Sequence, residues 1–150
     1  MLKSDRITDK ILRELSAQGR ISNQELAERV GLSASACLRR VTALEREGVI
    51  AGYRAVIDRT KLGQGFTAYI GVGLSDHSKA SQEAFEASIS QAEEVRECHN
   101  ITGMIEYLLR VECADLAAYK HFHTEVLGTL PQVSSITSYV VMGSPKDERA

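Results

Sequence analysis

Residues Ile21–Gly48 read ISNQELAERVGLSASACLRRVTALEREG, and this stretch decides the fold because two helix starts and a tight turn can be followed in it residue by residue. Ser22 is typical of a helix N-cap, and Glu25 three residues later completes a capping box. Ser33 is a second N-cap. It follows Gly31, the residue type that most easily ends a helix in the left-handed conformation. The stretch therefore predicts two helices that meet at a short glycine turn.

The second of these helices, about residues 34–47, has one apolar and one cationic face. Cys37, Val41 and Leu44 are spaced by four and three positions, so they share the face that is buried. Small and basic side chains lie opposite them, which is typical of a helix whose first turns enter a DNA major groove. The residues predicted to bind DNA are Ser33, Ala34, Ser35, Arg39, Arg40, Thr42 and Arg46.

Individual roles follow from position on this helix. We expect Arg39 to bond a guanine edge, and Arg40 and Arg46, nearer the rim, to contact phosphates. Arginines are also common on the solvated faces of ordinary helices. The combination of two capped helices, a glycine turn and a basic outward face favours DNA binding over that alternative.

Charge and composition are compatible with this interpretation. The 150-residue chain has a net charge of −2, but residues 1–58 hold ten Lys/Arg against eight Asp/Glu, and residues 59–150 hold eight against twelve. The excess of positive charge lies on the predicted DNA-binding half. No apolar run approaches the roughly 20 residues of a membrane helix, and the first ten residues lack the apolar core of a signal peptide. We therefore expect a cytoplasmic protein that does not enter the membrane.

The N-terminal half also contains a first helix, which we expect to begin after an N-cap at Ser4 and to end near Gly19. After the helix-turn-helix, residues 49–58 are rich in β-branched and aromatic types and predict a strand, either a wing or a strand leading out of the domain. Glycines and polar residues within 59–65 indicate a hinge. We expect a winged helix-turn-helix domain at residues 1–60 and a second domain at 61–150.

The second domain shows the order strand, helix, strand, strand, helix, strand. This order predicts an α+β fold with a four-stranded, ferredoxin-like βαββαβ sheet and both helices on one face. The expected strands are residues 66–74, 95–101, 105–113 and 133–142, and the expected helices lie within 84–92 and 116–130.

That arrangement leaves one sheet face uncovered. Gly71 and Gly73 alternate with apolar residues on the first strand, and one reason to keep glycine in a strand is close approach by another backbone. We infer that the uncovered face packs on a second subunit, which would present two recognition helices to two DNA half-sites.

The spacing of the cysteines and histidines argues against a catalytic or metal-binding site. Cys98 and His99 are adjacent on a strand and point to opposite faces, which does not suit a nucleophile and its base. His121 and His123 are two positions apart on a helix and do not share a face. Three cysteines without a C-x-x-C pair argue against a disulfide framework and a zinc ribbon. We expect no catalytic residues, no metal and no cofactor.

The chain resembles the Lrp/AsnC (feast/famine) transcriptional regulators over nearly its whole length. The motifs that carry the resemblance are Gly19-Arg20-Ile21-Ser22-Asn23, Glu25-Leu26-Ala27, Val30-Gly31-Leu32-Ser33, Cys37-Leu38-Arg39-Arg40-Val41, Leu44-Glu45 through Gly48-Val49-Ile50 to Gly52-Tyr53, Thr102-Gly103, Tyr107-Leu108-Leu109-Arg110-Val111, and Leu130-Pro131 with Val133 and Thr137.

The resemblance implies double-stranded DNA as a partner and a C-terminal domain that forms dimers, commonly assembled into octamers. It also implies a small effector, usually an amino acid, bound at a subunit interface near the turn between the second and third strands. In this sequence that turn, which we name the effector turn, consists of Thr102, Gly103, Met104, Ile105, Glu106 and Tyr107.

The effector turn departs from the family pattern, in which an acid, an aromatic and a second acid often follow the glycine. Met104 and Ile105 occupy the first two of those places, and Glu106 alone keeps an acid that can pair with an effector's ammonium group. Two readings stay open. An apolar lip of Met104 and Ile105 accepts a larger or more hydrophobic ligand, or the site has lost ligand binding.

The sequence thus predicts a sequence-specific DNA-binding transcriptional regulator that responds to a small effector such as an amino acid. The alternative is an architectural DNA-binding protein that needs no effector, for which the specificity ratio would be near one and the salt dependence steep.

Overall fold

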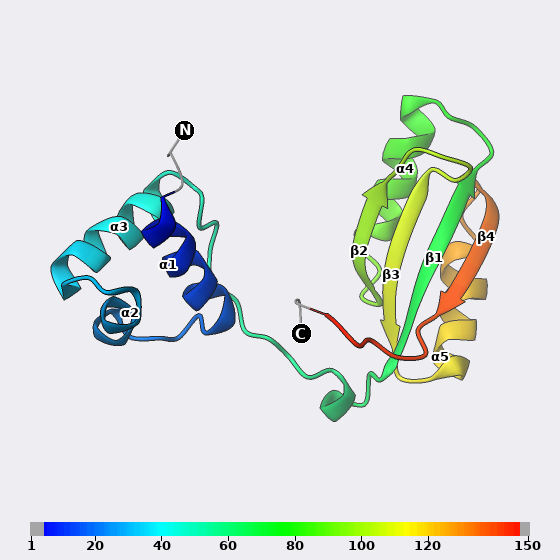
Figure 1. The fold of residues 1–150 in the computed structure, drawn as a ribbon. Helices are drawn as coiled ribbons and strands as arrows, with labels where there is room; N and C mark the ends of the chain where they lie inside the picture. The colour runs from blue at the N-terminus through cyan, green and yellow to red at the C-terminus, as the bar shows by residue number, and fades with distance from the viewer. Residues whose placement is uncertain (1–4, 148–150) are drawn as a thin grey trace. The chain divides into compact units, whose positions relative to one another are not determined.

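The computed structural model describes residues 5–147 and divides the chain into two compact units between Val56 and Ile57 (Figure 1). Each unit has its own hydrophobic core. Within the described residues, no helix combines the length and the apolar character that crossing a membrane requires.

The first unit contains three helices, α1 (Arg6–Ala17), α2 (Asn23–Val30) and α3 (Ala34–Arg46) (Figure 1). The predicted turn between the last two is confirmed. Gly31 ends α2 with a left-handed φ of 78°, and its N–H donates to the carbonyl of Ala27. A side chain at this position would be strained, so glycine permits the sharp reversal.

The predicted caps of α2 and α3 are formed. The Ser22 hydroxyl accepts a hydrogen bond from the N–H of Glu25 at 3.1 Å, and the Ser33 hydroxyl accepts one from Ala36 at 3.3 Å. The Glu25 carboxylate pairs with Arg29 at 2.5 Å, one turn further along α2. The two serine bonds satisfy backbone donors that the first turn of a helix leaves without partners. Of the predicted capping box only the serine half is formed, because the Glu25 carboxylate pairs with Arg29 instead of returning to the N–H of Ser22.

The start of α1 differs from the prediction. Ser4 lies outside the described residues, and the N-cap is Asp5, whose carboxylate accepts the N–H of Thr8 at 2.7 Å. Aspartate is as good an N-cap as serine, so sequence alone does not separate the two neighbours.

The core of the first unit is made by apolar residues from all three helices. The buried members are Ile11, Leu26, Ala27, Val30, Cys37 and Leu44. Val41 is partly buried against them, so the apolar face predicted for α3 is the one that packs inward.

The strand predicted over residues 49–58 is wrong. This segment is extended but is not assigned to any strand, and most of its side chains are exposed, including those of Tyr53, Val56 and Ile57. β-branched composition favours an extended backbone, but a strand also needs a neighbouring strand to complete its ladder, and the sheet of this chain does not include the segment. Tyr53 is held locally, since its hydroxyl donates to Glu45 of α3 at 2.8 Å.

The second unit confirms the predicted βαββαβ order. A short 3₁₀ turn, η1 (Thr60–Leu62), precedes the sheet. The elements that follow are β1 (Phe66–Leu74), α4 (Lys79–Ile89), β2 (Val95–Asn100), β3 (Tyr107–Cys113), α5 (Leu116–His121), the π-helical turn η2 (Phe122–Leu127) and β4 (Val133–Val140).

The strands form one antiparallel sheet in the order β2-β3-β1-β4, and α4 and α5 lie on the same face of it (Figure 1). The main core lies between this sheet face and the helices. Its buried members are Ala68, Ile70, Val72, Leu74, Phe85, Ile89, Tyr107, Leu109, Val111, Cys113, Tyr119, Phe122 and Leu127.

The second predicted helix is shorter than expected in its regular part. The apolar spacing over residues 116–130 continues through η2, where the backbone widens to a π-helical turn before Pro131. Because a π turn keeps the side chains of Phe122 and Leu127 in the core, the hydrophobic pattern does not reveal the change in winding.

The glycines of β1 make room for side chains of the same chain. A Cβ atom at Gly71 would lie 2.5 Å from Cδ1 of Ile105, and one at Gly73 would meet the hydroxyl of Ser135. Ile105 therefore lies directly over Gly71 on the sheet face away from the helices. The inference that these glycines are kept for a second subunit's backbone is not needed to explain them.

We expect Gly71→Ala to destabilise the protein by about 1–3 kcal/mol, because the new methyl group overpacks against Ile105. Urea unfolding of Gly71→Ala, Ile105→Ala and the double variant measures this. The double variant is expected to lose less stability than the two single variants together. Full additivity would contradict direct contact between the two positions.

Candidate functional sites: the outward face of α3 and the effector turn

The outward face of α3 carries four of the predicted DNA-binding residues. Ser35, Arg39, Thr42 and Arg46 are all exposed, whereas Cys37 and Leu44 on the opposite side are buried. The burial of the apolar residues sets the rotation of the helix about its own axis. The structure therefore groups the four polar residues on one solvent-facing surface, as the spacing predicted.

The first turn of α3 is fixed to α2 by hydrogen bonds. The Asn23 side-chain amide donates to the carbonyl of Ala34 at 2.8 Å, and the hydroxyls of Ser33 and Ser35 lie 3.3 Å apart. Asn23 thus ties the start of α2 to the start of α3. Asn23 is not among the predicted site residues, because an asparagine in a first helical turn usually bonds within its own turn.

Arg40 occupies a different position from its neighbour Arg39. Its guanidinium contacts both carboxylate oxygens of Asp5 at 2.8 and 3.0 Å and the hydroxyl of Thr8 at 3.2 Å. The backbone N–H of Thr8, and after it the Arg40 guanidinium, lower the pKa of Asp5 from 3.8 to about 2. Arg40 therefore connects α3 to the start of α1 and is not part of the outward face.

The effector turn does not form the apolar lip that the sequence suggested. Met104 is fully exposed, and Gly103 beside it has a positive φ of 130°. Ile105 points back over Gly71 of β1. Since Met104 is exposed to solvent and Ile105 packs on the sheet, the two side chains do not share one surface. Thr102, at the start of the turn, is exposed.

The carboxylate of Glu106 already has partners. One oxygen accepts the N–H of Leu74 at 2.7 Å, where the β1–β4 register shifts between Gly73 and Leu74. The other lies 2.8 Å from Nδ1 of His77. With 18% of its side chain exposed, Glu106 sits between the end of β1 and the segment that leads to α4. An effector ammonium group here would compete with His77 for the carboxylate.

Tyr107 lies on the opposite face of the sheet from Glu106. Its ring is buried, and its hydroxyl donates to Glu86 of α4 at 2.6 Å. Burial, followed by this bond, raises the pKa of Tyr107 to about 12. A cavity of about 360 Å³ between α4 and β2 includes Tyr107, Glu86 and Cys98 in its lining. Tyr107 and Glu106 therefore do not contribute to one pocket within a single chain.

The groups that might suggest metal or thiol chemistry are not brought together. Among the described residues, no three His, Cys, Asp or Glu side chains are grouped as a metal ion requires. Cys98 is exposed as a residue, but its side chain lines the cavity beside α4 and is partly desolvated there. This desolvation, with a smaller contribution from Glu86, raises the pKa of Cys98 to about 11, so its thiol is not activated as a nucleophile.

A capped helix-turn-helix with a polar, basic outward face, joined to a separate α+β unit, defines a DNA-binding regulator with a second, ligand-binding domain. Comparison with known proteins agrees. Residues 4–51 match the family model "Winged helix-turn-helix DNA-binding", and residues 67–150 match "Lrp/AsnC ligand binding domain". The chain belongs to the Lrp/AsnC family of transcriptional regulators.

Curated relatives and solved structures support the assignment. The chain is 41% identical over 142 residues to the leucine-responsive regulatory protein of Salmonella typhimurium, a match that spans 95% of this chain and 87% of the relative. The corresponding protein of Escherichia coli K12 is 40% identical over the same shares.

Two solved structures show the same fold over nearly the whole chain. A transcriptional regulator of Neisseria meningitidis in complex with L-Met has a TM-score of 0.92 and 35% identity, covering 97% of this chain and 94% of that one. AsnC of E. coli has a TM-score of 0.87 and 25% identity, covering 97% of each chain.

We expect Arg40→Gln to raise the pKa of Asp5 from about 2 toward 3.8, and to leave it lowered in part because the Thr8 N–H still bonds the carboxylate. A carboxyl carbon NMR titration measures this. In the native protein the lowered pKa stabilises the fold above about pH 4, and this contribution is lost as the pH falls toward 2.

The neighbouring substitution Arg39→Gln is the matched control and should leave the pKa of Asp5 unchanged. If Arg40→Gln also left it unchanged, the Arg40–Asp5 pair would be absent in solution.

Proposed function

We propose that this regulator reads DNA with the outward face of α3 and responds to an apolar amino acid bound at the effector turn. In this proposal residues 1–60 carry DNA binding, and residues 61–150 carry effector binding and self-association. The protein acts by binding alone, in the cytoplasm where its DNA lies. The observation that carries the proposal is the single exposed surface formed by Ser35, Arg39, Thr42 and Arg46.

The roles on α3 follow from where each side chain points. Arg39 lies in the middle of the outward face and suits a bidentate contact with guanine, while Ser35 and Thr42 suit short-range contacts to base edges. Arg46, in the last turn, suits a phosphate. Ser33 and Ala34, at the N-terminal end of α3, approach the backbone of the DNA in this arrangement. Arg40 instead holds α3 against α1.

Two copies are needed to read two half-sites, and the uncovered sheet face is the surface we propose for pairing. Tyr139 of β4 is 60% exposed and pairs in register with Tyr69 of β1 on this face. Leu108 of β3 is paired with Gly71 and extends the apolar area. We propose a dimer through this face, assembled further into an octamer as the family pattern implies.

The effector proposal rests on Glu106 and on the relatives. A regulator of similar fold has been solved with L-Met, and the relatives at 40–41% identity are leucine-responsive proteins. In this chain, an ammonium group would take the place of His77 beside Glu106, with the apolar part of the ligand near Met104.

One observation favours the second candidate function, an architectural DNA-binding protein without an effector. Both oxygens of Glu106 have a partner within the chain, so the only acid kept in the effector turn is already engaged without an effector. The two candidates differ in whether any amino acid binds and in whether DNA binding is sequence-specific.

We expect Arg39→Ala to weaken binding to a duplex selected by the native protein by about 10- to 100-fold, the loss of one bidentate base contact. Binding to an unrelated duplex should fall by less than about threefold. Fluorescence anisotropy at fixed salt measures both. Arg13→Ala, which removes the same charge from an exposed position on α1, is the control and should leave both affinities nearly unchanged. Equal losses on the two duplexes would make Arg39 a phosphate contact.

We expect calorimetry with L-Leu and L-Met to separate the two candidate functions through two variants with opposite effects. His77→Ala removes the group that competes for Glu106 and should tighten binding by about three- to fivefold, as expected for an exposed ion pair. Glu106→Gln still accepts the Leu74 N–H but should weaken binding at least about tenfold.

Glu86→Gln, the same change on the opposite sheet face, is the control for this pair of variants. No binding heat from the native protein or from His77→Ala would support the effector-independent alternative.

A further inference from the structure

The segment that joins the two units is held at both of its ends. On the side of the first unit, the Tyr53 hydroxyl donates to Glu45 of α3. On the side of the second unit, Arg59 contacts the carboxylate of Glu112 in β3. Residues 54–58 between these two points are all exposed. The connection is therefore a five-residue tether with a fixed point at each end.

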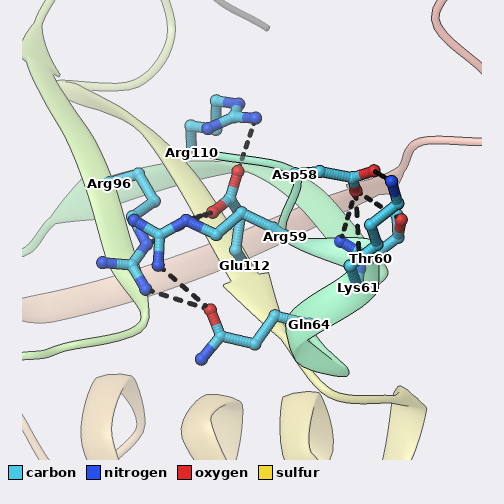
Figure 2. A network of polar contacts seen from close by, with 8 residues as sticks. All are labelled: Asp58, Arg59, Thr60, Lys61, Gln64, Arg96, Arg110 and Glu112. Atoms are coloured by element: carbon cyan, nitrogen blue, oxygen red, sulfur yellow. Dashed lines mark hydrogen bonds and ion pairs between the residues drawn. The ribbon is translucent and has the colours of Figure 1, made fainter. Parts of the chain in front are cut away.

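Glu112 is a buried carboxylate surrounded by three guanidinium groups (Figure 2). Arg110, two residues away on β3, lies 2.6 Å from it, Arg96 of β2 lies 3.3 Å away and Arg59 lies 3.7 Å away. The Glu112 side chain is only 7% exposed. A buried charge is costly unless it is paired, so burial of the Glu112 carboxylate favours its contacts with the three arginines.

Of these three arginines, Arg59 alone comes from outside the sheet, and it stands immediately before η1 (Figure 2). It also donates to the side-chain oxygen of Gln64 at 3.3 Å, an oxygen that accepts from Arg96 at 3.4 Å. Asp58, two residues before Thr60, accepts the N–H of Thr60 at 3.1 Å. The Thr60 hydroxyl, the largest cause, holds the pKa of Asp58 below its ordinary value. Residues 59–64 thus form a folded turn, which is bonded by Asp58 at the end of the tether and is fixed to the sheet through both Arg59 and Gln64.

We propose that the contact between Arg59 and Glu112 is a clamp that sets the length of the tether between the DNA-reading unit and the ligand-binding unit. With the clamp closed, residues 54–58 span at most about 18 Å. With it open, the next fixed point is Gln64, whose side chain is still bonded by Arg96 of β2, and residues 54–63 span at most about 36 Å when fully extended. Arg59 and Glu112 are positioning residues, because they act on DNA reading through the tether.

The length of the tether affects which spacings of DNA half-sites the protein can bind. This inference rests on the proposed function, in which two copies bind together. A short tether restricts where a second recognition helix can reach once the first is bound, so affinity depends steeply on the distance between half-sites. A longer tether lowers the effective concentration of the second recognition helix at the best half-site spacing, and it permits binding at other spacings. Opening the clamp should therefore flatten the spacing preference while leaving a single half-site unaffected.

The first part of the test examines the clamp without DNA. Amide hydrogen exchange of the full chain is followed over residues 58–65, where the N–H groups of Leu62 and Gln64 bond the carbonyl of Arg59. Arg59→Gln should speed exchange there by about fivefold, the factor that corresponds to one ion pair. The control Lys61→Gln makes the same charge change in the same turn. It removes only a solvent-exposed pair with Asp58 at 3.8 Å and leaves Glu112 untouched, so it should speed exchange by less than about twofold. Unchanged exchange in Arg59→Gln would overturn the clamp.

The second part measures affinity for a duplex selected by the native protein, for the same duplex with five base pairs inserted between half-sites, and for one half-site alone. We expect the insertion to cost the native protein and Lys61→Gln at least about tenfold, and Arg59→Gln less than about threefold. Glu112→Gln should behave as Arg59→Gln does. Equal affinity of all proteins for the single half-site is expected.

The results distinguish a failure of the clamp hypothesis from a failure of the proposed function. If Arg59→Gln keeps the native spacing profile although exchange is faster, the clamp does not set spacing and the inference fails. If the native protein itself shows no dependence on spacing, reading by paired half-sites fails, whereas the exchange result still decides whether the clamp exists.

Discussion

Burial of Cys37 and Leu44 in the first unit is the constraint on which the proposed DNA contacts depend, because it sets the rotation of α3 about its axis. With those residues inward, Arg39 faces solvent. The caps at Ser22 and Ser33 and the left-handed Gly31 fix where the helices begin and end. Each of these features lies within a few residues of the next, so the geometry of the reading face is determined locally.

The role of each charged side chain depends on the residues that the fold places beside it. Arg39 and Arg40 are adjacent in the sequence, yet one lies on the open face and the other pairs with Asp5. Glu106 and Glu112 are both acids of the second unit. The first bonds the end of β1 and His77, and the second binds three arginines. Formal charge alone therefore does not tell which groups are available to a ligand or to DNA.

The contrast between local sequence patterns and tertiary contacts explains which features could be predicted from the sequence and which could not. Helices, strands and the βαββαβ order follow from periodicity and caps, which are local. The strand at residues 49–58 was wrong because pairing needs a neighbour, and η2 was missed because a π turn preserves the apolar pattern. The partners of Arg40 and Glu106 lie 35 and 32 residues away, and the packing of Ile105 over Gly71 joins two strands. Local patterns do not encode those contacts.

The most direct test of the central claim, that the outward face of α3 reads bases, is selection of duplexes from a random pool by the variant Arg39→Gln. Glutamine bonds adenine as arginine bonds guanine. We expect one position in each half-site to change from guanine to adenine while the others keep their native preference. An unchanged consensus sequence, with the same guanine still required, would contradict it.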